Sequence, residues 1–354
     1  MNAIFIIIII IFLLVLSKKV GLNREGIIDS MKTIYCLAEM IELIERLAKE
    51  YPIGYATSPS ANTFLFRGES DYEYYLRPSI FREVLGGGES KRFILKEDEK
   101  RMLFAFRGEG SAYIQNAISD DIPRWLEYAR HYGVPTRLLD WTTNPLVALY
   151  FACKSLNGKD GSVWILHHNN YLLLFNKRLA EDVREKTGPN SLVESIATEK
   201  PSGINMPYIT TPFYVDSRMS AQSSMMMTWG DKPDSLEELI GEGHTLCLDE
   251  ENNDTLAEKE SHILEKVKID KDKKEKILRQ LDMIGINQKT LFPGLDGIGN
   301  YIQWKYSYTE SEITEKNMEI FENGTRHIIE SNDKNLKKNT PASCPRRKGL
   351  YKSD

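Results

Sequence analysis

The segment from Asn144 to Ala152 places the strongest constraint on the fold, because it reads as a short helix that is apolar on almost every side. Asn144 is suited to cap this helix, and Pro145 can occupy its first turn, where the missing N–H of proline costs nothing. The residues that follow, Leu146 to Ala152, leave no polar face for water. We therefore expect this helix to lie buried in the core.

The composition is that of a globular protein. The 354 residues are 41% hydrophobic and 27% charged, which allows one large domain or two smaller ones and argues against extensive disorder. The net charge of −5, from 46 basic and 51 acidic side chains, does not favour a nucleic-acid partner held through its phosphates. The four cysteines are far apart in sequence, so we interpret them as reduced thiols in the cytoplasm and predict no metal site.

An unbroken apolar run at residues 3–16 is followed by Lys18 and Lys19. Counted from Met1 to Ser17, the run just reaches the minimum of about 17 residues for a membrane-spanning helix, and the lysines would mark the following side as cytoplasmic. The alternative is that residues 1–30 are a mis-assigned start, since Met31 begins a good helix. We thus predict a cytoplasmic protein, with residues 3–19 as a candidate tether to the inner face of the membrane.

Apolar spacing and turn residues predict both helices and strands along the chain. We expect helices near residues 31–48, 96–106, 121–132, 145–152, 271–284 and 297–306, and strands near 63–66, 161–167, 213–215, 219–229 and 263–269. Residues 134–143 read as extended or looped, and 169–211 show no clear pattern. The predicted organisation is an anchor or mis-assigned start at 1–30, a leading helix and loop at 31–62, a main domain at 63–306 and an extension at 307–354, disordered from about residue 332.

Arg67 stands at the end of a short apolar strand and is followed by Gly68. A guanidinium offers a rigid fork that suits carboxylate or phosphate, and a glycine lets a ligand or another stretch of backbone approach closely. A ligand site and a buried salt bridge from Arg67 to Asp140 or Glu69 are both consistent with these residues.

Polar residues crowd the segment between two predicted helices. Arg137 and Asp140 could pair, Trp141 could offer a stacking face, and Thr142 a hydroxyl group. This density of polar groups beside a buried helix indicates either a site or a structural loop whose polar groups are satisfied.

Arg218 and Gln222 lie four residues apart, so both could face one cleft, although a structural role is equally open. The later turn from Phe292 to Asp296 is interpreted as structural, because it lets the last predicted helix dock.

Several segments together resemble the FRG domain, and the likeness extends from about Phe64 to Lys305. They are Phe66-Arg67-Gly68, Leu76 to Arg82, His131 to Thr142 with Pro145 and Ala148 to Ala152, and Thr290 to Pro293 with Leu295-Asp296-Gly297. The chain departs from the family pattern at Arg130, where glutamine is frequent, and at Ser224, Met225 and Gly294.

Such domains occur in bacteria and phages, and the resemblance implies a setting in antiviral defence. The FRG resemblance implies an α+β fold, with a mixed β-sheet and flanking helices. A looser similarity connects the chain with the mono-ADP-ribosyltransferases, and it is carried by Arg67 and by Thr142-Thr143 before the helix that contains Ala148 to Phe151. On that resemblance Arg67 would hold the phosphates of NAD, Thr142 would support the nicotinamide ribose and Trp141 would stack on a ring. Gln222 falls near the expected catalytic carboxylate, whose charge a glutamine cannot supply.

The resulting hypothesis is an NAD-using ADP-ribosyltransferase or NAD glycohydrolase. Its alternative is a non-catalytic module that senses a nucleotide, a nucleic acid or a phage protein. The site residues implied are Arg67, Thr142 and Gln222 as catalytic, and Gly68, Arg77, Arg137, Asp140, Trp141 and Arg218 as ligand-binding.

Overall fold

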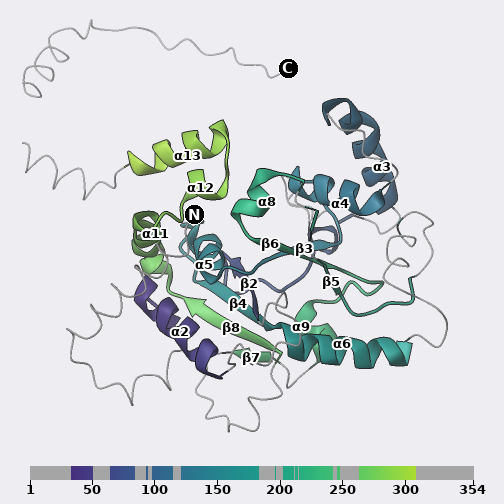
Figure 1. The fold of residues 1–354 in the computed structure, drawn as a ribbon, viewed down its shortest axis with the longest axis horizontal. Helices are drawn as coiled ribbons and strands as arrows, with labels where there is room; N and C mark the ends of the chain where they lie inside the picture. Colours follow the sequence, from purple (N-terminus) through teal and green to yellow (C-terminus); the bar gives the residue numbers. More distant parts are fainter. Residues whose placement is uncertain are drawn as a thin grey trace, which may run out of the picture. The chain divides into compact units, whose positions relative to one another are not determined.

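The computed structural model of the chain (Figure 1) describes residues 33–50, 64–83, 93–94, 98–114, 121–182, 196, 202–210, 212–213, 215–241, 245–247 and 263–307. The chain divides into two compact units, residues 1–298 and 299–354, and the sheet with its covering helices belongs to the first. The predicted anchor at residues 3–19, the loop before Phe64 and the tail beyond 307 lie outside the described residues.

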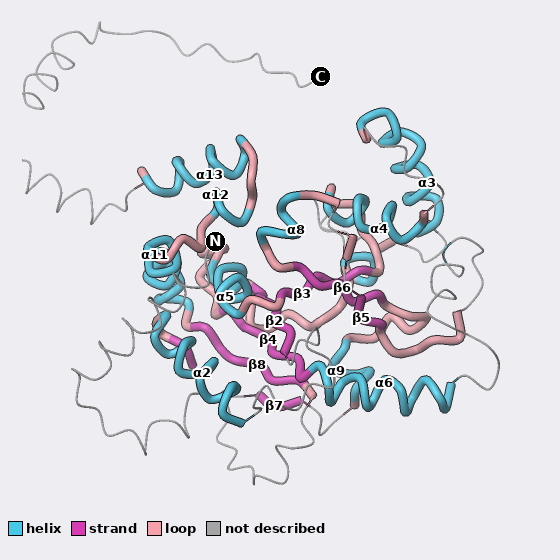
Figure 2. Tube along the Cα trace, viewed as in Figure 1, coloured by secondary structure: helices cyan, strands magenta, loops and turns pink. Residues whose placement is uncertain are grey.

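The described part of the first unit is built on a mixed sheet of eight strands, in the order β1-β8-β4-β2-β3-β6-β5, with β7 also paired to β8. The strands are β1 (Thr33–Ile34), β2 (Phe64–Glu69), β3 (Leu138–Thr142), β4 (Gly161–His167), β5 (Tyr208–Thr210), β6 (Ser224–Thr228), β7 (Thr245–Cys247) and β8 (Leu264–Ile269). The β1–β8 and β7–β8 pairs are parallel and the others antiparallel. This mixed sheet with flanking helices confirms the predicted α+β class (Figure 2).

Helices cover both faces of the sheet. The helices of the described residues are α2 (Leu37–Glu50), α3 (Asp98–Gly110), α4 (Ile122–His131), α5 (Pro145–Cys153), α6 (His168–Asp182), α8 (Ser217–Ala221), α9 (Leu236–Ile240), α11 (Lys274–Met283), α12 (Gln288–Leu291) and, at the boundary of the two units, α13 (Leu295–Lys305). Side chains alternate between faces along a strand. Leu138 and Met226 therefore pack with α4 and α8 on one face, while Leu139 and Met227 pack with α6 and α9 on the other.

The predicted buried helix is confirmed as α5, which lies over β2 and β4 (Figure 1). The side chain of Asn144 caps it by accepting a hydrogen bond of 3.0 Å from the amide of Leu146. Helix and sheet meet closely at Gly68, where an added Cβ would lie 1.8 Å from the carbonyl oxygen of Ala148. The glycine after Arg67 thus makes room for the backbone of α5, and Gly68 is not open to a ligand on that side.

Several boundaries differ from the sequence prediction, and for the first helix and for β3 and β6 the reason is pairing between distant strands. The first helix begins at Leu37 and not near Met31, since Thr33–Ile34 form β1 beside β8. The expected strand at 219–229 is the end of α8 followed by β6, and the segment at 134–143 contains β3. Phe213 and Val215 lie in no strand, and the patternless region from 169 onwards contains most of α6.

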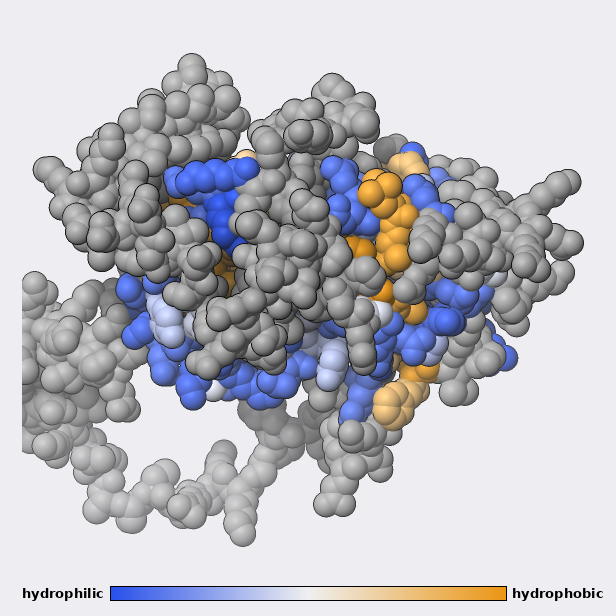
Figure 3. Space-filling view, turned by 90° about the horizontal axis from the view of Figure 1, so that it is seen from below, coloured by the Kyte–Doolittle hydropathy of each residue, from blue (hydrophilic) through white to orange (hydrophobic). Residues whose placement is uncertain are grey.

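The surface of the described residues seen in Figure 3 is mainly hydrophilic, with a band of hydrophobic residues between hydrophilic ones. Among the described residues, no helix is long and apolar enough to cross a membrane. Within the same residues, no group of three or more histidine, cysteine or acidic side chains is placed to hold a metal ion.

Candidate functional site

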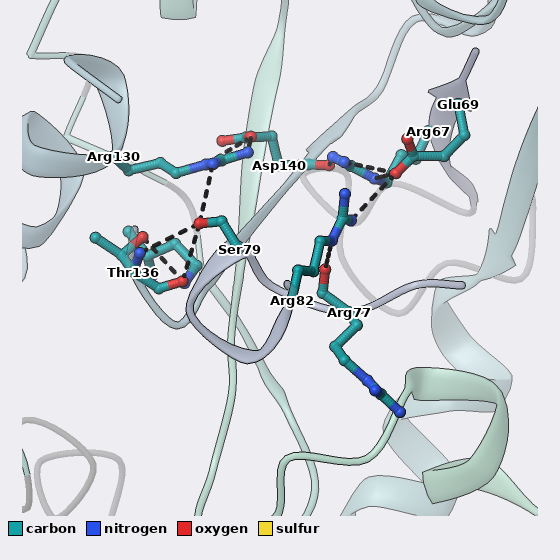
Figure 4. Close-up of polar contacts among 9 residues, drawn as sticks. Arg67, Glu69, Arg77, Ser79, Arg82, Arg130, Thr136 and Asp140 are labelled. Atoms are coloured by element: carbon teal, nitrogen blue, oxygen red, sulfur yellow. Dashed lines mark hydrogen bonds and ion pairs between the residues drawn. The ribbon is translucent and has the colours of Figure 1, made fainter. Parts of the chain in front are cut away.

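The sheet opens between β2 and β3. Strand β2 pairs with β4 along all six of its residues, but with β3 at a single residue pair, Phe66 and Thr142. Strand β3 pairs fully with β6 on its other side. Beyond that one pair, charged side chains from β2, β3, the end of α4 and the loop after β2 converge on the opening (Figure 4). We call this group the arginine cluster; its members are Arg67, Glu69, Arg82, Arg130 and Asp140.

Arg67 links the two strands where their backbone pairing ends. Its Nε lies 2.9 Å and its Nη2 2.7 Å from Oε1 of Glu69, and its Nη1 donates to the backbone carbonyl of Asp140 at 2.5 Å. The side chain is 13% exposed. Of the two possibilities that the sequence leaves open for Arg67, a ligand site or a buried salt bridge to Asp140 or Glu69, the structure contains the salt bridge, and its carboxylate partner is Glu69.

Asp140 receives two hydrogen bonds from Arg130, from Nε at 3.0 Å and from Nη2 at 2.6 Å, both to Oδ2. Its side chain is 40% exposed. Burial alone would raise the pKa of this carboxyl group, but the charges of Arg130 and Arg67 outweigh burial and hold the pKa below its usual value. The charge of Asp140 in turn raises the pKa of Arg130. Asp140 is thus an ionised carboxylate within reach of solvent.

Arg82 is the member of the cluster with the weakest ion pair. Its Nε donates to the carbonyl of Arg77 at 2.5 Å, and its Nη2 lies 3.5 Å from Glu69. Burial lowers its pKa, and Arg67 and Arg130 lower the pKa further against the opposing charge of Glu69. Within the described residues, its Nη1 has no hydrogen-bond partner, and the side chain is 34% exposed.

The loop that carries Arg82 is fixed at both of its ends. Ser79 accepts a hydrogen bond from the amide of Thr136 at 3.3 Å, and Leu76 donates its amide to Glu237 at 3.1 Å. Arg77, an expected ligand-binding residue, pairs instead with Glu238 at 3.1 Å and points away from the other arginines (Figure 4). The loop therefore presents Arg82 to the opening and directs Arg77 elsewhere.

Two residues expected to bind a ligand lie in the interior. Trp141 is 2% exposed and packs in the core formed with α6 and α9, so its ring has no free face for stacking. Arg137 pairs with Glu99, with side chains 2% and 4% exposed. The expected pair of Arg137 with Asp140 is wrong, because residues three apart point to opposite faces once this segment continues into a strand.

Thr142 and Gln222 are brought together, but through the backbone. The hydroxyl of Thr142 donates to the carbonyl of Gln222 at 2.6 Å and accepts from the amide of Asn144 at 3.0 Å. The side chain of Gln222 donates to the carbonyl of Leu291 at 3.0 Å. Both side chains thus hold the strand end, α8 and α12 in place, and this geometry supports a structural role for each.

Arg218 belongs to different surroundings. Its guanidinium carbon lies 5.9 Å from the ring centroid of Phe292, beside Lys154. Sequence reasoning therefore placed Arg67 and Asp140 correctly together, and it did not select Glu69, Arg82 and Arg130 for the site. Arg82 stands in a motif of the FRG resemblance, and Arg130 replaces a frequent glutamine, which were the available indications.

Comparison with known proteins gives one family. The family model of the FRG domain matches residues 62–161. No curated protein and no solved structure matches the chain, so the similarity to ADP-ribosyltransferases has no support from these comparisons. All five residues of the arginine cluster fall within the matched range, and the chain thus contains an FRG domain whose β2–β3 opening carries the cluster.

Proposed function

We propose that the FRG domain binds a phosphate-bearing nucleotide at the arginine cluster. The observation that carries the proposal is the charge balance, because three guanidinium groups share two carboxylates. In addition, Nη1 of the partly exposed Arg82 makes no hydrogen bond within the described residues. A bound phosphate would offset the repulsion that lowers the pKa of Arg82, and a planar guanidinium suits phosphate oxygens.

Arg82 is the residue to change, because its ion pair is the longest in the cluster. Removing the guanidinium of Arg82 leaves the ion pair between Arg67 and Glu69 in place. Binding of NAD, ADP-ribose and ADP would be measured by titration calorimetry at low salt. We expect Arg82→Gln to weaken binding at least tenfold, about 1.4 kcal/mol. Arg101→Gln is the matched control, since Arg101 is an exposed arginine on α3 that pairs with Asp98.

Thermal melting of each variant establishes that it is folded. Equal affinities of wild type and Arg82→Gln for all three nucleotides would overturn the proposal, as would the absence of binding to the wild type at millimolar concentration. A binding loss shared by Arg101→Gln would point to general charge and not to the cluster.

A second candidate is the turnover of NAD that the resemblance implies, and Asp140 is what favours it. An ionised and partly exposed carboxylate beside the arginines is the group this chemistry requires and that Gln222 cannot supply. As the bond from ribose C1′ to nicotinamide breaks, its electron pair leaves with nicotinamide. Asp140 would stabilise the cationic C1′ until a water attacks it and releases a proton. The setting in antiviral defence rests on the resemblance alone.

Turnover is tested by incubating the protein with NAD and following nicotinamide by chromatography. We expect release by the wild type and not by Asp140→Asn, with NAD still bound by the variant. Binding without release on prolonged incubation would reject this candidate and leave a sensing module.

A further inference from the structure

Two cationic side chains meet at one aromatic ring, and neither belongs to the arginine cluster. Lys154 follows the end of α5, and its Nζ lies 4.5 Å from the ring centroid of Phe292 and 5.9 Å from that of Phe151. The guanidinium carbon of Arg218, in α8, lies 5.9 Å from the ring centroid of Phe292. The two rings pack edge to face, with centroids 6.0 Å apart, so they form a fixed apolar wall beside both charges.

The arrangement is held by contacts within the fold. Gln222 ties the end of α8 to the last carbonyl of α12, which brings Arg218 close to Phe292. Asp216 caps α8 by accepting a hydrogen bond from the amide of Arg218 at 2.6 Å. The backbone positions of Lys154 and Arg218 are therefore held by the end of α5 and by α8.

No carboxylate neutralises this pair within ion-pair distance among the residues that the structure describes. The nearby acid is Asp216, whose Oδ1 accepts from the amide of Arg218 and from the hydroxyl of Ser217, and whose Oδ2 lies 3.7 Å from His131. Burial lowers the pKa of Lys154, and the charge of Arg218 lowers it further. A single cation over an aromatic ring is an ordinary stabilising contact, but a second like charge beside it is unfavourable without an anion.

We propose that Lys154 and Arg218 form a phosphate-binding site, with Phe151 and Phe292 as an apolar wall for the organic part of the ligand. The ligand is either free phosphate or a phosphate monoester. This site uses none of the residues of the proposed nucleotide site, so an experiment can contradict either proposal without contradicting the other.

The test measures the affinity of the full chain for inorganic phosphate and for phenyl phosphate by titration calorimetry at constant ionic strength. We expect phosphate to bind, and Lys154→Gln and Arg218→Gln each to weaken binding at least tenfold. Lys276→Gln, an exposed lysine on α11, should leave the affinity unchanged. The titrations are repeated in the Arg82→Gln background, where the arginine cluster no longer contributes phosphate binding, and the same losses are expected there. Tighter binding of phenyl phosphate would identify a monoester, and equal binding would identify free phosphate; both support the site.

Thermal melting adds a readout that a purely structural contact would not give. Without phosphate, Lys154→Gln removes a repulsion and should melt no lower than the wild type. With phosphate, the wild type should gain stability and Lys154→Gln should gain less. Phosphate binding to the Arg82→Gln variant that survives the further changes Lys154→Gln and Arg218→Gln would overturn the proposal. So would destabilisation by Lys154→Gln that is the same with and without phosphate.

Discussion

Replacing Gly68 with alanine tests whether the glycine beside Arg67 serves the fold or a ligand. The new Cβ would lie 1.8 Å from the carbonyl oxygen of Ala148 and 2.6 Å from the amide nitrogen of Ala152, whereas real Cβ contacts essentially never fall below 3.0 Å. The backbone of α5 must therefore move by about 1 Å or more. Overpacking costs about 1–3 kcal/mol, and a backbone partner that cannot rotate away places this case near 3 kcal/mol.

Gly108→Ala is the matched control, because no atom lies within 4 Å of its added Cβ and Gly108 is in a helix. Alanine is more stable than glycine there by about 0.5–1 kcal/mol. Circular dichroism melting should show opposite shifts, a fall of roughly 5–10 °C for Gly68→Ala and a rise of about 1–4 °C for Gly108→Ala. An unchanged Tm for Gly68→Ala, together with loss of nucleotide binding, would refute the packing role and assign the glycine to a ligand.

Burial raises the pKa of Glu127 to about 7, although the amide of Phe213 donates to its carboxylate. Because this folded pKa lies above the usual value, stability is full below about pH 4.5 and declines as the pH rises to about 7. In urea unfolding, Glu127→Gln should therefore gain about 1–3 kcal/mol over the wild type at pH 8 and nothing at pH 4, and an equal gain at both would contradict this. Arg137→Met leaves Glu99 buried without its partner and should cost about 3–5 kcal/mol by the same assay, most of it recovered in Arg137→Met/Glu99→Met. A cost below about 1 kcal/mol for Arg137→Met would argue against a buried pair.

The parts of the fold that could be predicted from the sequence are those fixed by local pattern. The apolar run after Pro145 identified α5, and the apolar spacing at 263–269 identified β8. The start of α2 was misplaced because the residues before it are fixed by β8, more than two hundred positions away in sequence. Local propensity carries no information about such a partner.

The same limit applies to the candidate site. Local sequence pattern does not mark Arg82 and Arg130 as site residues, and it is the fold at the opening between β2 and β3 that brings Arg130 to Asp140 and Arg82 to Glu69. The buried positions of Trp141 and Arg137 were missed for a related reason. A segment rich in polar residues is consistent with a ligand site, and it is equally consistent with a buried strand whose polar groups are all hydrogen-bonded. Which of the two it is depends on whether other elements of the fold cover the segment.

The single residue pair between β2 and β3 has a consequence for how the domain comes apart. Backbone hydrogen bonds are continuous from β1 through β8 and β4 to β2, and again from β3 through β6 to β5, but they nearly stop at the line between these two halves. Across that line, charged side chains such as Arg67 supply cohesion that high salt weakens. Each half should then open with a free energy of its own, and hydrogen–deuterium exchange should show one level of amide protection in the first half and another in the second. The sheet would thus consist of two cooperative units.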